Sequence, residues 1–569
     1  MSVVAISKET TERLDTPTGE LGTVEVLTGK EVLPLLSDVN FIKEWDNLYQ
    51  RCPWGTVFQS SAFVSTWYQH YVDQHCPILV ISRHEGKLTG LLPLAAGISD
   101  LGIAGAGGYD AYYHTWLTHA HHGESFITAA LHVIRKHFPG QDIILKYIPL
   151  GAPVAWLEHD PIWSTRCVIR TFSRPLLDLS DPDTDKFIRK KNFREQYNRL
   201  KKLGNVYLEP VQDIDRFSSI IDQLADQYDF RKTATHNIRP FRDNPLKKRF
   251  LLDLFRKGIL ITSVLRVNEE IAAGLIATTG KDGWVHGAGI NTHAPTYSKY
   301  SPGYLIMQLF GVQLKQDGFA VLDITPGGHA YKERHANAHD SVIELRVTNN
   351  IKAQNFRLFF KVKEVLKARL QTRGINPQQL RRALTPWLSM ANDRHSVLDK
   401  LFRLSSVGSL HPKANIKVFA LTLPSSSGSN AYSIRKNSLQ DLLNYSPQAN
   451  GLSECKFISR ATELYETGHW SYSYSENGVL QCLVWHAPQI AASLELKPIP
   501  GISNTSLPSI AVLLQDVYYH PAASDKLLLF MTELATELVA SSGDNTVYLI
   551  GTSVPPALQK FSKYLTPAK

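Results

Sequence analysis

Two short stretches of the chain carry residue types that could serve group-transfer chemistry. Ser301-Pro302-Gly303 precedes Tyr304 and further apolar residues at helical spacing, which predicts a helix start. Free amides and the positive dipole end of such a helix bind anionic groups, so Ser301 to Tyr304 are the predicted seat for the phosphates of a cofactor. An ordinary helix start is the alternative, and the motif alone favours it. Asp323 ends a short apolar strand before a Pro-Gly-Gly turn. Open α/β folds place chemistry at such strand ends, and we expect Asp323 to be a general base.

A polar cluster, Tyr331-Lys332-Glu333-Arg334, follows that turn. The two glycines could fold Lys332 back over the same cleft as Asp323. There the carboxylate could accept the proton of an attacking amine, and the lysine could stabilise an oxyanion. Either residue could instead form a simple ion pair, so a structural role stays open.

Residues 186–202 are strongly basic and predict a helix that carries Lys190 and Arg194. A solvated helix face and a functional patch are about equally expected for such a run. A functional patch of this kind would bind a nucleotide-linked precursor, CoA phosphates or RNA. Aromatic interleaving is limited to Phe193 and Tyr197, and no RNA-binding motif accompanies it, so direct nucleic-acid recognition is disfavoured.

The composition predicts a multidomain cytoplasmic protein. A chain of 569 residues exceeds one hydrophobic core, which predicts two to four domains. No apolar run approaches the roughly 20 residues that cross a bilayer, so no membrane span is expected. The five cysteines are scattered and odd in number, which argues against disulfides and structural zinc. The histidines at 114, 119, 121 and 122 have no standard metal spacing, and we expect them to be solvated.

One order of elements recurs along the chain. Hairpin signals join residues 78–82 to 88–94, and a strand at 101–106, a helix at 124–137 and a strand at 142–148 follow. The same order returns from residue 259 to residue 324 and again from residue 470 to residue 550. Residues 350–404 read as a basic helical connector. The sequence therefore predicts three copies of one α/β unit.

Several motifs in order carry a family resemblance: Trp45, FQSSAFVSTW, the LLPL strand, GAGGYD, RKKNFREQYNRLKKLG, the SPG helix start and LDITPGGHAYKER. From Trp45 to about His335 the chain resembles the CelD-like acetyltransferases of the GNAT superfamily, relatives of the FemABX peptidyltransferases. The resemblance implies two GNAT-like halves with mixed sheets flanked by helices and an acyl-CoA donor. It also implies a cleft lined by Asp110, Arg231, Asp323 and Lys332. Tyr109, Tyr331, Lys190 and Arg194 complete the residues expected to bind substrate.

The predicted organisation is a loose tail at 1–22, GNAT-like halves at 23–175 and 176–348, the connector at 349–404 and a third GNAT-like module at 405–569. In the third module the loop that opens the helix reads Ala-Ala-Ser-Asp-Lys in place of a glycine-rich loop. Side chains there would block the approach of pyrophosphate to backbone amides, which favours a structural or acceptor-binding role.

The predicted reaction is transfer of an acetyl or other acyl group from acyl-CoA to an amine or hydroxyl. Attack would be direct, because the cysteines and serines lack a nucleophile-elbow context. A small molecule, glycan or peptide would be the acceptor, and the resemblance suggests surface-polysaccharide or cell-envelope metabolism. No metal is expected, and the oligomeric state stays open. The alternatives are an aminoacyl-tRNA-dependent transferase of the FemABX type and a degenerate GNAT-like scaffold.

Overall fold

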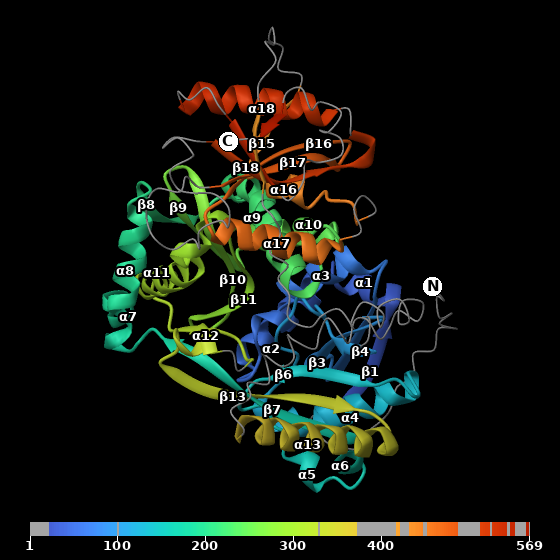
Figure 1. Cartoon of the computed structure of the whole chain (residues 1–569). Helices are drawn as coiled ribbons and strands as arrows, with labels where there is room; N and C mark the ends of the chain where they lie inside the picture. The colour runs from blue at the N-terminus through green and yellow to red at the C-terminus, as the bar shows by residue number, and fades with distance from the viewer. Residues whose placement is uncertain are drawn as a thin grey trace. The chain divides into compact units, whose positions relative to one another are not determined.

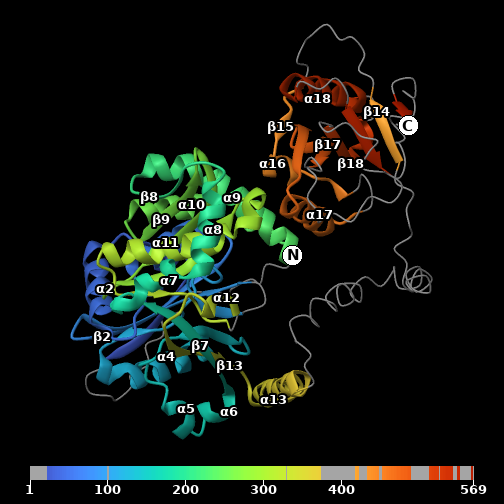
Figure 2. The same ribbon diagram turned by 60° about the vertical axis from the view of Figure 1, so that its left-hand side comes forward.

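The computed structural model describes residues 22–98, 102–327, 330–372, 417–421, 432–447, 452–487, 512–523, 526–542, 547–551 and 565–567. The chain divides into two compact units (Figures 1 and 2). The first unit comprises Met1–Tyr228, Pro240–Ala294 and Tyr300–Phe360, and the second comprises Asp229–Arg239, Pro295–Lys299 and Lys361–Lys569. The predicted tail up to residue 21 and the part of the predicted connector beyond residue 372 lie outside the described residues.

The first unit holds two copies of the predicted order of elements. The first copy consists of the β2–β3 hairpin (Cys76–His84, Lys87–Ala96), β4 (Ile103–Gly105), α4 (Gly123–His137) and β6 (Ile143–Ile148). The second consists of the β9–β10 hairpin (Leu260–Val267, Glu270–Thr279), β11 (Trp284–His293), α11 (Pro302–Gln316) and β12 (Val321–Asp323). In both copies the hairpin pairs antiparallel with the next strand, and the strands on either side of the helix pair in parallel.

The second unit holds the third copy. It consists of the β16–β17 hairpin (Trp470–Glu476, Val479–Ala487), β18 (Val512–Tyr519), α18 (Lys526–Ser542) and β19 (Val547–Gly551). Its pairings match those of the other two copies. The prediction of three related α/β modules with mixed sheets is therefore confirmed.

The hairpins form where the sequence places residues that tolerate a left-handed backbone. Asn477 and Gly478 have φ values of 51° and 72°, and Glu85 and Gly86 have values of 50° and 78°. Two consecutive left-handed residues give the turn whose twist matches that of paired strands. The local turn chemistry thus fixes the hairpin that begins two of the modules.

The two modules of the first unit share one sheet. Its strand path is β1-β2-β3-β4-β6-β13-β7-β12-β11-β10-β9-β8, with β1 at Thr23–Thr28 and β8 at Val206–Val211. β7 (Cys167–Asp178) follows the first module but pairs with β12 of the second, whereas β13 (Ala338–Val347) follows the second module and pairs with β6 of the first. Each module thus lends a strand to the other, and the predicted boundary at 175/176 falls inside β7.

Helices cover this sheet where glycines leave room. A Cβ on Gly90 of β3 would lie 2.4 Å from the ring of Phe126 on α4, and a Cβ on Gly274 of β10 would lie 2.3 Å from Leu224 on α9 (Ile214–His236). α2 (Val39–Arg51) begins at Asp38, whose side chain accepts hydrogen bonds from the amides of Asn40 (2.8 Å) and Phe41 (3.3 Å). The glycines thus let α4 and the part of α9 before Asp229 pack closely on the sheet, and the cap sets where α2 begins.

The described chain also has a packed helix pair, an interrupted basic helix and one long helix. α3 (Ser61–Tyr71) packs against α10 (Leu246–Arg256), where the rings of Phe63 and Phe250 meet edge to face. The predicted basic helix at 186–202 is interrupted at Lys190, whose backbone is extended, so α7 (Lys186–Arg189) and α8 (Lys191–Lys201) are separate helices. α13 (Asn350–Thr372) forms the first part of the predicted connector. Within the described residues, no helix is both long and apolar enough to cross a bilayer.

The second unit has a sheet of order β15-β16-β17-β18-β19-β14-β20, in which β14 is Lys417–Leu421, β15 is Arg435–Lys436 and β20 is Leu565–Pro567. Alternate residues of β17 face its two sides. Cys482 and Val484 join the core with α18, while Leu483 and Trp485 join the core with α17 (Glu454–Glu466). Of the predicted glycine-free loop, Ser524 and Asp525 lie outside the described residues.

Candidate active site

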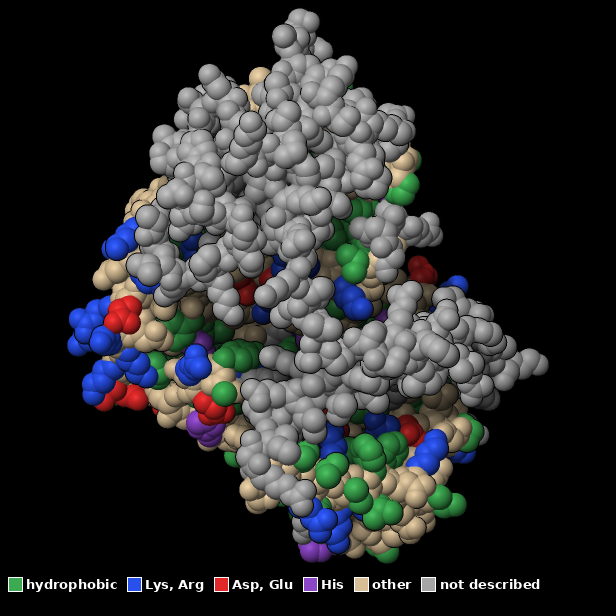
Figure 3. Space-filling model, viewed as in Figure 1, with side chains coloured by type: hydrophobic (Ala, Val, Ile, Leu, Met, Phe, Trp, Pro, Cys, Tyr) green, Lys and Arg blue, Asp and Glu red, His purple; other side chains and the backbone are tan. Residues whose placement is uncertain are grey.

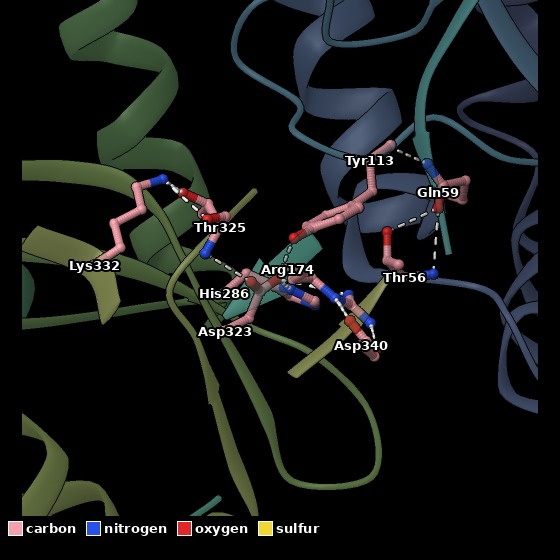
Figure 4. Close-up of polar contacts among 9 residues, drawn as sticks. All are labelled: Thr56, Gln59, Tyr113, Arg174, His286, Asp323, Thr325, Lys332 and Asp340. Atoms are coloured by element: carbon pink, nitrogen blue, oxygen red, sulfur yellow. Dashed lines mark hydrogen bonds and ion pairs between the residues drawn. The ribbon is translucent and has the colours of Figure 1, made fainter. Parts of the chain in front are cut away.

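Asp323 lies at the centre of a buried hydrogen-bond network (Figure 4). Its side chain is fully buried and accepts hydrogen bonds from the hydroxyl of Tyr113 and from Nδ1 of His286 at 2.9 Å. The other carboxylate oxygen, Oδ1, accepts a hydrogen bond from the amide of Thr325 at 2.8 Å. A guanidinium nitrogen of Arg174 lies 3.8 Å from Oδ2, the oxygen that Tyr113 and His286 contact. β12 ends at Asp323 and pairs with β11 at His286, so the sheet register itself sets this contact.

The charges in the network stabilise the ionised carboxylate. Burial alone would raise the pKa of Asp323, but the hydrogen bond from His286 and the charge of Arg174 lower it below its ordinary value. Arg174 also donates two hydrogen bonds to Asp340 of β13, one of them at 2.7 Å. Burial and the neighbouring carboxylate raise the pKa of the Tyr113 phenol well above 10. Tyr113 therefore stays protonated and donates to Asp323.

The FQSS stretch positions Tyr113 from the first module. Nε2 of Gln59 donates to the backbone carbonyl of Tyr113 at 2.7 Å, and the hydroxyl of Thr56 donates to Oε1 of Gln59 at 2.8 Å (Figure 4). The ring of Phe58 lies 5.6 Å from that of His286 and 5.9 Å from that of Tyr113. The first module thus supplies one wall of a site whose carboxylate comes from the second.

Lys332 is joined to Asp323 through the turn between them. Nζ of Lys332, on α12 (Ala330–Glu333), donates to the carbonyl of Thr325 at 2.9 Å, to its hydroxyl at 2.6 Å and to the carbonyl of Pro326 at 3.0 Å. Thr325 has a φ of 69°, which is strained for a β-branched residue. Burial lowers the pKa of Lys332 to about 8. Lys332 thus folds back onto the turn that follows Asp323, and its predicted role in the cleft stays a prediction.

The strand pair opens just beyond Asp323. β11 and β12 pair only over Trp284 to His286 and Val321 to Asp323, after which β11 continues to His293 paired with β10 but not with β12. A Cβ on Gly287 would lie 2.9 Å from the carbonyl oxygen of Asp323, so glycine permits this close approach. At the far end of β11, a Cβ on Gly303 would lie 3.6 Å from His293 and 3.8 Å from Asn291. The first turn of α11 therefore adjoins the free end of β11.

Basic and aromatic side chains gather at that first turn of α11. Ser301 caps the helix with a left-handed backbone, φ 54°, and the ring of Tyr304 lies 5.4 Å from that of His335. Gln308 of α11 bonds to Nδ1 of His335 at 2.7 Å. Burial and the positive charges of Arg334 and Lys190 lower the pKa of His335 to about 4. The predicted phosphate seat and the start of the basic helix thus share one positively charged neighbourhood.

The other predicted residues lie elsewhere or contact other groups. Asp110 forms an ion pair with Lys247 of α10, and the exposed ring of Tyr109 lies 4.0 Å from Nζ of Lys146. Arg194 and Tyr331 are exposed. Arg231 belongs to the segment of α9 that groups with the second unit. Of the predicted set, the structure brings together Asp323 with Lys332, and Lys190 with Ser301 to Tyr304; the roles of all of them stay predictions.

Sequence reasoning missed four members of the network: Tyr113, Arg174, His286 and Asp340. Their local patterns are those of ordinary strand and loop residues, and only Arg174, a charge within the otherwise apolar end of β7, gives a sequence signal. The expectation of solvated histidines is wrong for His114, which is buried and bonds to the carbonyl of Gly108 at 3.2 Å. Among the described residues, no three His, Cys, Asp or Glu side chains form a metal-binding group.

The arrangement offers a place for an anion and a place for proton handling. The positive end of the α11 dipole, with Lys190 and Arg334, can hold the phosphates of a nucleotide-linked donor. Asp323 has donors on both oxygens and a lowered pKa, which makes it a weak proton acceptor and a strong orienter of Tyr113 and His286. With Nδ1 of His286 donating to the carboxylate, Nε2 is left as the hydrogen-bond acceptor of the imidazole.

Comparison with known proteins finds one family model that matches part of the chain. A family model for an acetyltransferase (GNAT) domain matches residues 188–333, which contain Ser301 to Tyr304, His286, Asp323 and Lys332. No curated protein matches the chain. Together with the three matching modules, this segment defines a fold of the GNAT acyltransferase type. The predicted CelD-like subgroup is a finer assignment that stays a prediction.

Solved structures with similar folds are distant. FemX is 8% identical with a TM-score of 0.39 and covers 55% of this chain and 98% of its own. A tandem GNAT protein from the clavulanic acid biosynthesis pathway is 11% identical with a TM-score of 0.35 and covers 57% and 98%. L-PGS from Bacillus licheniformis is 12% identical with a TM-score of 0.36 and covers 56% and 95%.

Proposed function

We propose that this protein is an acyltransferase of the GNAT type that moves an acyl group, most simply acetyl, from acyl-CoA to an amine or hydroxyl acceptor. The observation that carries the proposal is the placement of two groups along β11. The carboxylate network meets β11 at His286, and the first turn of α11 meets it at Asn291. Five residues of β11 separate these points, but β11 bulges between them. Their partners on β10, Thr278 and Leu275, are three residues apart, roughly 10 Å at the rise of a strand. An acyl-CoA has its phosphates and its thioester at opposite ends of an extended arm, so it suits two such anchors.

The donor would lie along the opened edge of β11. Its phosphates would contact the first turn of α11, where Lys190 and Arg334 add positive charge. Its thioester would point toward the end of β12. In this pose Tyr304 and His335 would pack against the donor near its phosphates, because their rings border the same turn.

The reaction would be a direct attack. The lone pair of the acceptor forms a bond to the thioester carbon, the carbon–sulfur bond breaks, and the acceptor proton leaves while the thiolate of CoA is released. Asp323 would hold His286 and Tyr113 in position, with Nε2 of His286 as the group able to take the proton. Lys332, charged at neutral pH and bound to the turn after Asp323, would keep that turn in its strained form. The general-base role predicted for Asp323 itself stays a prediction that this geometry disfavours.

Calorimetric titration with acetyl-CoA tests the donor site. Gly303→Glu brings a side chain and a negative charge to the first turn of α11 and should weaken acetyl-CoA binding at least about tenfold. Gly303→Ala is the matched control, because its Cβ would make only ordinary contacts at 3.6 and 3.8 Å, and its affinity should be unchanged. Equal affinity in both variants would move the donor elsewhere. Failure of the parent protein to bind any acyl-CoA would favour a degenerate scaffold.

One observation favours a second candidate, an aminoacyl-tRNA-dependent transferase. The exposed basic side chains of α7 and α8 form a dense patch (Figure 3), and they are Lys186, Arg189, Lys190, Lys191, Arg194, Arg199 and Lys201. A patch of this density suits a long polyanion as well as it suits CoA. Binding of tRNA that weakens steeply with salt, together with no binding of acyl-CoA, would select this candidate.

A further inference from the structure

α13 has one face that packs on the first unit. Ala353 is fully buried, and a guanidinium nitrogen of Arg357 donates to the carbonyl of Cys167 at 2.6 Å. The guanidinium of Arg170 on β7 lies 4.4 Å from the ring centre of Phe360. At 100° per residue, these positions share one side of the helix. This side holds α13 against β7, as Figure 1 shows.

The opposite side of α13 is an apolar stripe, defined by six exposed residues with relative exposures from 47% to 73%: Ile351, Leu358, Phe359, Val362, Val365 and Leu366. Helical spacing confines them to an arc of about 120°, directly across from Ala353. In Figure 3, hydrophobic side chains gather in the region that α13 occupies in Figure 1. Monomeric proteins rarely leave a contiguous apolar patch without a binding role.

Basic residues border the apolar stripe. Lys361 and Lys363 are exposed and fall on either side of it, and Lys352 lies on the same flank as Lys363. Arg369 is exposed and continues the line of the stripe in the last turn of the helix. Glu364 is the one acidic residue in the sequence of α13. Long basic side chains can bend away from an apolar surface and place their charges at its edge.

This charge pattern selects among the surfaces that could cover the stripe. A second copy of α13 would bring the same lysines together, and like charges would repel. The segment that follows, residues 373–416, has seven Lys and Arg against two Asp, so it is basic as well. An anionic lipid surface complements both features, because its acyl chains accept the apolar stripe and its headgroups pair with the flanking lysines.

We propose that α13 is an interfacial helix that seats this protein on an anionic lipid bilayer, with the apolar stripe inserted at the boundary between headgroups and acyl chains. This goes beyond acyl transfer and does not depend on it. The helix lies in the plane of the interface, and its packed face keeps it attached to the sheet of the first unit.

Vesicle flotation with the full chain tests this proposal. The protein should float with vesicles of phosphatidylglycerol and phosphatidylcholine and much less with phosphatidylcholine alone. The triple variant Phe359→Asp, Val362→Asp, Leu366→Asp should lose at least about tenfold in binding. The matched control is Val39→Asp with Leu150→Asp, because these side chains are equally exposed, at 65% and 67%, and lie on other elements. The control should float like the parent.

A second variant separates charge from apolar insertion. Lys361→Glu with Lys363→Glu leaves the stripe intact and should lower binding to anionic vesicles roughly tenfold or more, with little change on neutral vesicles. Thermal melts of all variants should match that of the parent. The proposal is overturned if the parent does not float, or if the triple variant floats as well as the control. It is also overturned if sedimentation shows that the parent self-associates through the stripe and does not bind vesicles.

Discussion

The hydrogen bond from Tyr113 to Asp323 can be tested by a double-mutant cycle. Tyr113→Phe removes only the hydroxyl, and Asp323→Asn removes the charge that this hydroxyl meets while keeping the size of the side chain. Both groups are fully buried, so neither change is compensated by water. If the network is as described, the two substitutions should not be additive in the free energy of unfolding.

The expected changes in the free energy of unfolding follow from the groups that each side chain contacts. Tyr113→Phe should cost about 1.5–3 kcal/mol, because the lost hydrogen bond ends on a charged acceptor. Asp323→Asn should cost about 3–5 kcal/mol, because it leaves Arg174 and the donors of Tyr113 and His286 around a neutral amide. When Asp323→Asn is already present, the hydroxyl meets a neutral group, an interaction worth about 0.5–1.5 kcal/mol. The coupling should therefore be about 1–1.5 kcal/mol.

Urea unfolding of the four proteins gives the coupling directly. Tyr71→Phe serves as the matched control, because the Tyr71 hydroxyl is buried and meets the neutral amide of Asn244 at 3.2 Å. Its combination with Asp323→Asn should be additive. A coupling below about 0.5 kcal/mol between Tyr113 and Asp323 would refute the network.

The same carboxylate predicts a pH dependence. The folded pKa of Asp323 lies below its unfolded value, so its contribution to stability is complete above the unfolded pKa and is lost as the pH falls through the folded pKa. The Asp323→Asn variant should show a smaller loss of stability in acid than the parent. Identical acid profiles would mean that the carboxylate is not preferentially ionised in the fold.

Three further predictions concern the groups around this network. The folded pKa of Lys332, about 8, lies below its unfolded value, so the unfolded chain binds more protons at pH values between the two. The free energy of unfolding should therefore rise from pH 8 to pH 10. Urea titrations should show that Lys332→Met flattens this rise. The pKa of His335, about 4, should rise by about one unit when acetyl-CoA places its phosphates nearby, and NMR titration would detect this rise. The pKa of His114 should not change. An unchanged pKa of His335 would mean that the phosphates bind elsewhere. Lys190→Glu should raise the Kd for acetyl-CoA roughly fivefold, whereas Lys202→Glu, farther along the same basic run, should leave the Kd unchanged. Equal effects of the two substitutions would mean that the basic residues act only through their total charge.

The three-module architecture could be predicted from the sequence because its signals are local. Turn residues such as Asn477-Gly478 and runs of buried apolar residues mark each hairpin, and the small residues before Tyr304 mark the start of α11. The helix of basic residues was also predicted, although its interruption at Lys190 was not. Such features depend on neighbours within a few positions, which a linear sequence displays.

The exchange of strands between modules was decided by tertiary structure. β7 could pair with the sheet of its own module as well as with β12, since both edges offer the same backbone hydrogen bonds. Which pairing wins depends on how all the helices pack at once. That choice brings Arg174 of β7 against Asp323 of β12, more than a hundred residues away in the chain.

Some features of the candidate site could likewise be predicted from the sequence, and others depend on the folded chain. The sequence by itself determined that Asp323 ends a strand and that Lys332 follows a Pro-Gly-Gly turn, because strand ends and glycines are visible locally. It did not determine what surrounds the carboxylate, since Tyr113, Arg174 and His286 come from three separate elements. Their burial with Asp323 surrounds an expected proton acceptor with hydrogen-bond donors that favour its ionised form, and the predicted general-base role stays a prediction. A carboxylate's role depends on the donors and charges within a few ångströms, and only the folded chain sets those.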